Sequence, residues 1–325
     1  MKNTFEKQDV YEVLTARIIE ALESGTRPWV RPWDSSLAMG EGLPINAVTG
    51  KPYSGVNMLS GLYEMSKAKS EDPRFCTFAQ AKAKGWHIKP GSKGIPMVKW
   101  VDARESKKKD ESKGDDEGTE KENLKEDKPY FFPCKFTVFH ASCVDGIPPL
   151  EKKETIKREP GAMEKEIDSL VEAVGVRRHV DTQAYYRMSE DSIGIPPVTA
   201  FKSEGHYAST LAHELCHATG HPDRLKRDMR GGFGSPLYAQ EELRAELGSV
   251  FLAAKHGWNM PAEIFDNNAA YMESWVKALK NDKKEIFKAS SDAQKIVTFI
   301  SEKKEMALKK DEKEEIIHKP KAMGF

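Results

Sequence analysis

Apolar residues recur at helical spacing near both ends of the chain. Within residues 5–24 the apolar positions Val10, Leu14, Ile18 and Leu22 fall on one helical face, and Gly25 follows as a cap. The same period predicts helices over residues 163–174, 236–256, 261–281 and 283–306. The second half of the chain is therefore expected to be mainly helical.

Shorter alternating segments lie between these helices. Strands are predicted over residues 97–101, 136–139 and 182–188, and the last of these is followed by Ile193-Gly194-Ile195-Pro196-Pro197. Residues 78–84 indicate a short helix that Gly85 ends. The predicted fold class is α+β: a small N-terminal α+β domain, followed by a mainly helical domain with a short sheet.

Changes in composition mark the boundaries. In residues 102–128, 19 of 27 residues are charged, which predicts a disordered insertion inside the first domain because such a segment cannot bury a core. Polar residues 151–160 separate a first domain, 1–150, from a second domain, 161–306. Lys-rich residues 307–325 are expected to form a frayed tail.

The net charge favours no class of partner, because 51 Lys and Arg balance 51 Asp and Glu. The distribution is uneven: from Arg74 to Trp100 there are six basic residues and no acidic one. The four cysteines form no C-x-x-C pair, and neither a signal peptide nor an apolar run of eighteen residues is present. We therefore expect a reduced cytoplasmic protein with no membrane partner.

One motif carries the candidate chemistry. Residues His213-Glu214-Leu215-Cys216-His217 match H-E-x-x-H, in which two histidines four apart share a helix face and can bind one Zn²⁺. Glu214 between them would act as general base toward the activated water. Gly220 and Pro222 follow as helix-ending residues. Chance would produce this spacing in only a few per cent or so of such chains.

A catalytic zinc needs a third protein ligand, and the sequence offers competing ones. Glu242 and Glu246 lie four apart on the next predicted helix, so one can bind the metal while the other hydrogen-bonds a ligand histidine. Asp223 would instead complete H-E-x-x-H-x-x-G-x-x-D. Glu242 is the preferred ligand; Asp223 and Glu246 are the main alternatives, and Glu241 is a further one.

The sequence leaves open the role of one segment before the motif and the identity of the residue that stabilises the oxyanion. The segment Ala184–Met188 is either an edge strand that pairs with an extended peptide substrate or a strand of the core. For stabilisation of the oxyanion, Tyr207, Tyr238 and His256 are equivalent candidates.

The motif and its surroundings resemble a known family. The run His213–His221, with Arg224-Leu225, Arg227 and Glu241-Glu242-Leu243 after it, is similar to the C-terminal half of ArdC/TraC-type antirestriction proteins. Pro28-Trp29, Pro32-Trp33, Thr49-Gly50-Lys51-Pro52-Tyr53 and Gly91-Ser92-Lys93-Gly94 resemble the N-terminal half. The resemblance runs over roughly residues 8–300. Two departures are Val138–Cys143, where the family tends to show Asn and Gln, and the long charged insertion.

The resemblance implies an N-terminal domain that binds single-stranded DNA and a C-terminal zincin-like metallopeptidase domain. It also implies carriage by plasmids or other mobile elements, whose DNA such proteins shield from restriction, and a protein substrate that the sequence does not identify. Asp223 falls at a variable family position, which favours Glu242 as the ligand.

The N-terminal residues are compatible with this function, because single strands are bound by basic grooves with aromatic platforms. The predicted nucleic-acid-binding residues are Arg27, Trp29, Arg31, Trp33, Lys51, Tyr53, Lys89 and Lys93. Trp29 and Trp33 are the preferred stacking residues because prolines bracket them. Without the resemblance, aromatic residues in a small domain more often belong to its core.

Overall fold

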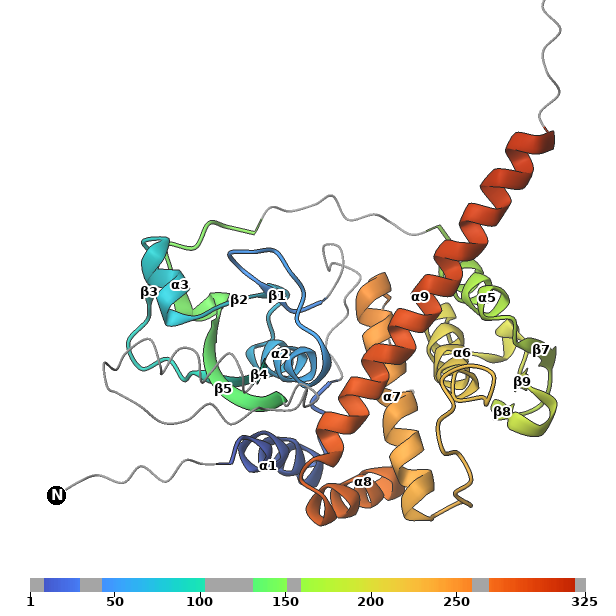
Figure 1. The fold of residues 1–325 in the computed structure, drawn as a ribbon, viewed down its shortest axis with the longest axis horizontal. Helices are drawn as coiled ribbons and strands as arrows, with labels where there is room; N and C mark the ends of the chain where they lie inside the picture. Colours follow the sequence, from blue (N-terminus) through green and yellow to red (C-terminus); the bar gives the residue numbers. More distant parts are fainter. Residues whose placement is uncertain (1–8, 30–42, 103–130, 151–158, 259–268, 319–325) are drawn as a thin grey trace, which may run out of the picture.

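The structure of the chain is a computed structural model, and it describes residues 9–29, 43–102, 131–150, 159–258 and 269–318 (Figure 1). Within the described residues, no helix is both long and apolar enough to span a membrane.

The N-terminal part contains three helices and two small sheets among its described residues. Its elements are α1 (Val10–Glu23), β1 (Ile45–Asn46), α2 (Gly55–Ala68), β2 (Arg74–Cys76), α3 (Phe78–Ala83), β3 (His87–Ile88), β4 (Ile95–Asp102), β5 (Phe131–His140) and β6 (Val144–Asp145). The larger sheet has the order β1-β2-β5-β4, in which β1 and β2 are parallel and the other pairs antiparallel. Strands β3 and β6 form a separate antiparallel pair.

The C-terminal part is mainly helical. Its elements are α5 (Ala162–Val174), β7 (Arg177–Val180), β8 (Tyr185–Arg187), β9 (Ser192–Ile195), α6 (Glu204–Ala218), α7 (Pro236–His256), α8 (Ala269–Asn281) and α9 (Glu285–His318). The sheet order is β7-β9-β8, with β7 parallel and β8 antiparallel to β9. In this sheet β8 is an edge strand.

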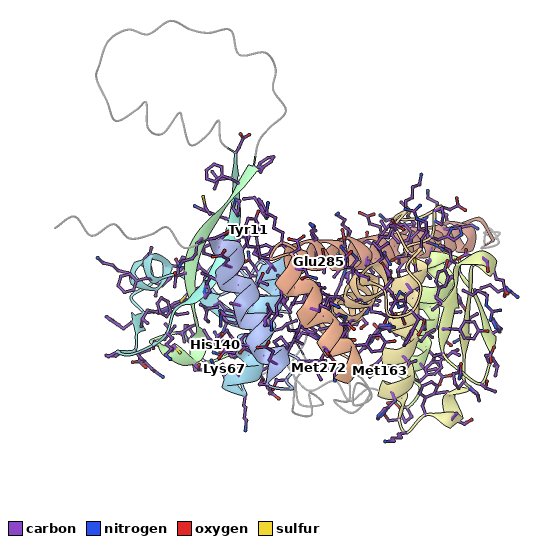
Figure 2. All side chains as sticks on the ribbon, turned by 90° about the horizontal axis from the view of Figure 1, so that it is seen from below. Tyr11, Lys67, His140, Met163, Met272 and Glu285 are labelled. Atoms are coloured by element: carbon purple, nitrogen blue, oxygen red, sulfur yellow. The ribbon has the colours of Figure 1, made fainter. Side chains whose placement is uncertain are left out.

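One cluster of buried apolar side chains extends across both parts. A single cluster of buried side chains includes Leu14 and Leu59 from the N-terminal part and Leu211, Leu247 and Ile296 from the C-terminal part. Helix α9 packs against α2, α5 and α7, and α1 packs on α8, as Figures 1 and 2 show. The C-terminal helices therefore pack against the N-terminal part, which also has two buried clusters of its own, one around Met97 and one around Cys76.

The α+β prediction and its helical second half are confirmed, as are several element boundaries. Helix α1 forms because Asp9 caps it, accepting a hydrogen bond from the Tyr11 amide at 2.9 Å. Helix α7 was predicted at its observed bounds, where Ser235 caps its first turn and Gly257 ends it in the left-handed conformation. The predicted strand over 97–101 is part of β4, and 136–139 is part of β5; these two strands pair antiparallel.

Other predictions were wrong or lie outside the described residues. The tail prediction is wrong for residues 307–318, which continue α9, because this Lys- and Glu-rich segment has high helix propensity and no proline before Pro320. Helix α2 and strand β7 were not predicted. Of the insertion 102–128, only Asp102 is described, as the last residue of β4.

Candidate metal centre

Helices α6 and α7 bring the candidate ligands together from two places in the sequence. Helix α6 begins where Ser203 caps it by accepting a hydrogen bond from the His206 amide at 3.3 Å. Gly248 on α7 allows a close approach, because a Cβ there would lie 2.9 Å from the Cys216 sulfur. Cys216 is fully buried at this helix contact.

The donors of His213, His217 and Glu242 converge on one point, with all ligand atoms within 4.8 Å of one another. The two Nε2 atoms lie 3.1 Å apart, and the Glu242 carboxylate oxygens lie 3.4 Å from His213 Nε2 and 3.5 Å from His217 Nε2. Ligands at tetrahedral zinc distances are separated by roughly 3.3 Å. The three residues therefore fit a small divalent cation.

Glu241, next to Glu242, holds one of these histidines in place. His217 Nδ1 donates to the Glu241 carboxylate at 3.1 Å, which leaves the Nε2 lone pair directed toward His213 and Glu242. Arg227 donates to both Glu241 oxygens, at 2.8 and 3.0 Å, and to the carbonyl of Cys216 at 2.7 Å. Two imidazole lone pairs facing each other repel unless a proton or a cation lies between them.

Charge at the site also favours a cation. Burial opposes protonation of His213, but the Glu242 carboxylate and the negative charge of Glu214 and Glu246 raise the pKa of His213 to about 9. Burial would raise the pKa of Glu241, yet hydrogen bonds from His217 and Arg227 lower this pKa to about 2. The centre therefore presents a negative potential to an ion.

The centre opens into a cavity of about 350 Å³, which we call the metal cleft. Glu214 lies in its wall, and among the described residues its carboxylate has no hydrogen-bond or ion-pair partner. The segment Ala184–Met188, which includes the edge strand β8, borders the same cleft. This segment combines features of the two roles that the sequence left open: β8 is at the sheet edge, and Ala184 and Tyr186 also pack against the core.

The structure does not bring the alternative ligands to this point. The side chain of Asp223 is 90% exposed, and its carboxylate lies 3.6 Å from His221 Nδ1. Glu246 is buried one helical turn beyond Glu242, where its Oε1 accepts from Trp29 Nε1 at 3.1 Å and from Arg27 at 3.3 Å. The hydrogen bond to a ligand histidine that we expected from Glu246 comes instead from Glu241.

Only one of the three candidates for oxyanion stabilisation lines the metal cleft. Tyr207 is buried and donates to Asp168 at 3.1 Å, while His256 contacts Glu166 at 2.7 Å, and neither lines the cleft. Tyr238 lines it beside Tyr271, whose hydroxyl oxygen lies 3.0 Å from that of Tyr238. Burial and the neighbouring Tyr271 and Glu242 raise the pKa of Tyr238, so this hydroxyl stays protonated.

Comparison with known proteins places this geometry in a family. A family profile described as zincin-like metallopeptidase matches residues 165–292, and one described as the N-terminal domain of the anti-restriction factor ArdC matches residues 8–139. The metal-free crystal structure of the antirestriction protein ArdC from a plasmid is 32% identical, with a TM-score of 0.72 over 91% of this chain and 98% of that one.

The chain belongs to the ArdC family of antirestriction proteins. A Mn(II)-bound structure of the plasmid ArdC matches with 33% identity and a TM-score of 0.69, again over 91% of this chain and 98% of that one. An uncharacterized protein, y4eC, of Sinorhizobium fredii is 33% identical over 90% of this chain and 91% of its own length.

Longer family members extend well beyond the shared region. Two Escherichia coli proteins named DNA primase TraC are 39% and 36% identical, over 90% and 92% of this chain. The chain spans 27% and 20% of their lengths, so the primase name belongs to those proteins.

The prediction that Trp29 stacks on the bases of DNA is wrong, because Trp29 is buried in this ArdC-family fold. Its side chain is 2% exposed, packs against Trp275 with ring centroids 5.9 Å apart, and donates to Glu246. Arg27 joins the same buried carboxylate. Both side chains fix the N-terminal segment to α7, because a buried carboxylate requires donors, and they are not available to a nucleic acid.

The other predicted contacts differ in their environment. Arg31 and Trp33 lie outside the described residues. Lys51 is exposed, whereas Tyr53 is half-buried against Phe75, with ring centroids 6.2 Å apart. Lys89 donates to the Ser142 carbonyl at 2.8 Å. Lys93 lines a second cavity, on the N-terminal part.

Proposed function

We propose that this ArdC-family protein binds single-stranded DNA through its N-terminal part and hydrolyses a protein substrate at a zinc-dependent site in its C-terminal part. The observation that supports the enzymatic half is the convergence of His213, His217 and Glu242 within 4.8 Å, with Glu214 lining the same cleft. The Mn(II) in a related ArdC supports a divalent metal here as well.

In this proposal His213, His217 and Glu242 hold one Zn²⁺, which when bound supplies a Lewis acid that activates water near neutral pH. Glu214, which has no partner among the described residues, accepts the proton of the attacking water and returns it to the leaving amine. Glu241 and Arg227 orient His217, and the hydroxyl of Tyr238 donates to the developing negative charge.

A peptide is the substrate class that best suits the cleft. Strand β8 is an edge strand in its sheet and borders the metal cleft, so its free backbone groups can pair with an extended chain. Arg224 fixes the connection between β8 and β9 to α6, since it donates to Asp191 at 2.7 and 2.8 Å and to the Ala218 carbonyl at 2.9 Å. The strand and the metal ligands are thereby held in one frame.

Metal analysis of the purified full chain tests the ligand set. The wild-type protein is expected to hold about one metal ion per chain, and Glu242→Ala and His217→Ala to lose it. Asp223→Ala is the matched acidic control and should retain the metal. Retention by Glu242→Ala with loss in Asp223→Ala would refute the proposed ligand set.

The variant Glu214→Gln distinguishes metal binding from hydrolysis. This variant should bind metal as the wild type does, yet show no hydrolysis of a peptide library, since it cannot accept a proton. Protection of transferred DNA that survives Glu214→Gln unchanged would favour a DNA-binding protein with a structural or inactive metal site. Hydrolysis without any binding of single-stranded DNA would favour a plain metallopeptidase.

A further inference from the structure

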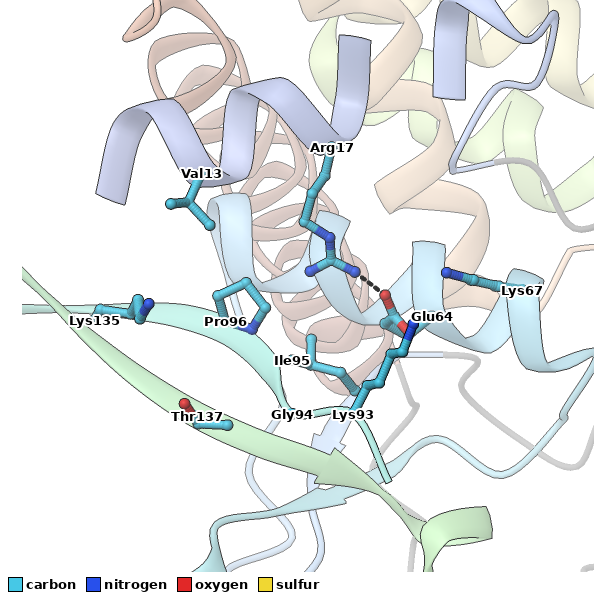
Figure 3. A pocket seen from close by; sticks show the side chains of 10 residues that line it. All are labelled: Val13, Arg17, Glu64, Lys67, Lys93, Gly94, Ile95, Pro96, Lys135 and Thr137. Atoms are coloured by element: carbon cyan, nitrogen blue, oxygen red, sulfur yellow. Dashed lines mark hydrogen bonds and ion pairs between the residues drawn. The ribbon is translucent and has the colours of Figure 1, made fainter. Parts of the chain in front are cut away.

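A second cavity, of about 360 Å³, lies on the N-terminal part between α1, α2 and the β4–β5 pair (Figure 3). Four basic side chains line it, Arg17, Lys67, Lys93 and Lys135, against one acidic side chain, Glu64. We call it the basic cavity.

Three of the four positive charges in the basic cavity have no partner within the described part of the chain. Arg17 donates to Glu64, which neutralises the one carboxylate. In the described part of the chain, Lys67, Lys93 and Lys135 have no ion-pair partner, and all three are exposed. Three unpaired ammonium groups around one hollow are a site for an anion with several charged groups, such as a phosphodiester chain.

Aromatic side chains continue the same surface. Strands β4 and β5 pair residue for residue from Ile95↔Val138 to Asp102↔Phe131, so side chains alternate strictly between the two faces. Pro96 and Trp100 therefore share the face of Lys135 and Phe131. Trp100 is 53% exposed and Phe131 is 52% exposed, although large aromatic side chains are usually buried.

The opposite face of this strand pair is already occupied. Ile95 and Met97 lie on that face, and they form a buried cluster with Met65, Phe75 and Val138. Trp100 and Phe131 are thus not needed to close this core, and four residues along β4 separate Trp100 from Pro96, about 13 Å. A strand that leaves the basic cavity would reach these rings within a few nucleotides.

We propose that single-stranded DNA crosses this face, with its phosphates on Lys67, Lys93 and Lys135 and its bases stacked on Trp100 and Phe131. The inference rests on the proposed DNA-binding function and assigns it a surface. Basic residues with adjacent aromatic platforms are the combination that binds single strands with little sequence preference. Duplex DNA would satisfy the lysines but leaves no free base face for the rings.

Fluorescence anisotropy with a labelled oligo-dT and the full chain tests the basic half. The triple variant K67E/K93E/K135E should bind far more weakly, and its slope of log K against log salt should be shallower by about 2, since each phosphate contact on a single strand contributes about 0.7. The matched control K82E/K84E/K99E changes the same charge; Lys82 and Lys84 lie on or directly after α3, and Lys99 lies on the opposite face of β4.

The aromatic half has a separate readout. Trp100→Ala should weaken oligo-dT binding by about 5- to 100-fold and leave the salt slope unchanged, because stacking releases no counterions. Phe78→Ala removes a ring that is 62% exposed elsewhere in the domain and should have little effect. Binding of a DNA hairpin duplex should be insensitive to Trp100→Ala.

Failure of the assigned DNA-binding surface and failure of DNA binding itself would give different results. Wild-type binding that both charge variants weaken equally would overturn the assigned surface and leave DNA binding intact. A Trp100→Ala protein that binds oligo-dT as the wild type does would overturn the stacking role. No binding of oligo-dT by the wild type at low salt would overturn the DNA-binding half of the proposed function as well. Metal content and melting curves verify that each variant is folded.

Discussion

The candidate metal-binding residues of the metal cleft and the lysines of the basic cavity differ in their burial and in their pairing. In the cleft, Glu241, Glu242 and His217 are all less than 10% exposed, and each has at least one partner from another turn or helix. In the basic cavity, the lysines are exposed and, among the described residues, unpaired. The side chains of the metal cleft are therefore held in place by contacts within the protein, whereas the lysines of the basic cavity are exposed and can bind an anion.

This difference follows from what each ligand requires. A small cation needs donors held within tenths of an ångström, and the helix pair α6–α7 supplies that rigidity through packing and the Glu241–Arg227 hydrogen bonds. A flexible polyanion instead gains most of its binding free energy from released counterions, which needs exposed charge but little fixed geometry. Burial and pairing therefore indicate which kind of ligand each region suits.

The largest expected effect is the loss of stability when Trp29 is removed, because Trp29 is buried and paired like the residues of the metal cleft. Trp29→Ala should lower the free energy of unfolding by about 3–5 kcal/mol, because a large buried ring is lost and Glu246 loses a donor. Urea unfolding measures this, with Phe78→Ala as an exposed aromatic control that stays within about 0.5 kcal/mol. Weaker binding of oligo-dT at unchanged stability would show instead that Trp29 stacks on bases.

Metal removal probes the rigidity of the cleft itself. At a free metal concentration about 100 times Kd, the ion should add about 2.7 kcal/mol to the free energy of unfolding, and a chelator should remove it. Thermal melts with and without the chelator measure this difference. In His217→Ala the chelator should change nothing, and an equal change in that variant would place the stabilising ion elsewhere.

A smaller effect is expected at the residue that orients His217. Glu241→Gln should lower metal affinity about 10- to 100-fold, because it weakens the hydrogen bond that fixes this histidine and unpairs Arg227. Competition with a chromogenic chelator measures the affinity. Glu273→Gln on the exposed surface of α8 is the control. Unchanged affinity in Glu241→Gln would mean that helix packing alone positions the ligand.

The smallest effect separates two lysines of the N-terminal part. Lys89→Ala should weaken oligo-dT binding by no more than about twofold, because its ammonium already donates to Ser142 and lies 3.7 Å from Asp145. Lys93→Ala, whose side chain lines the basic cavity, should weaken it more. The reverse order in anisotropy titrations would move the DNA to the β3–β6 side of the domain.

Local sequence signals predicted much of the fold where caps and periodicity agree. Helix α7 was predicted at its observed bounds because Ser235, Pro236 and Gly257 mark its ends. Helix α2 was missed because it contains Gly55 and Gly61, which lower helix propensity. Gly61 is there for packing: a Cβ would lie 2.5 Å from Pro44, a contact that no local pattern reveals.

The H-E-x-x-H motif and the helix that carries it came from the sequence alone, because a spacing of four residues fixes a shared helix face. The family resemblance strengthened the preference for Glu242 as third ligand. Only the tertiary structure decided which acid faces the histidines, that Glu241 rather than Glu246 supports His217, and that Trp29 is buried. Those outcomes depend on how α6, α7 and the N-terminal segment pack together. Contacts between residues far apart in the chain are set by that packing, and no periodicity in the sequence encodes them.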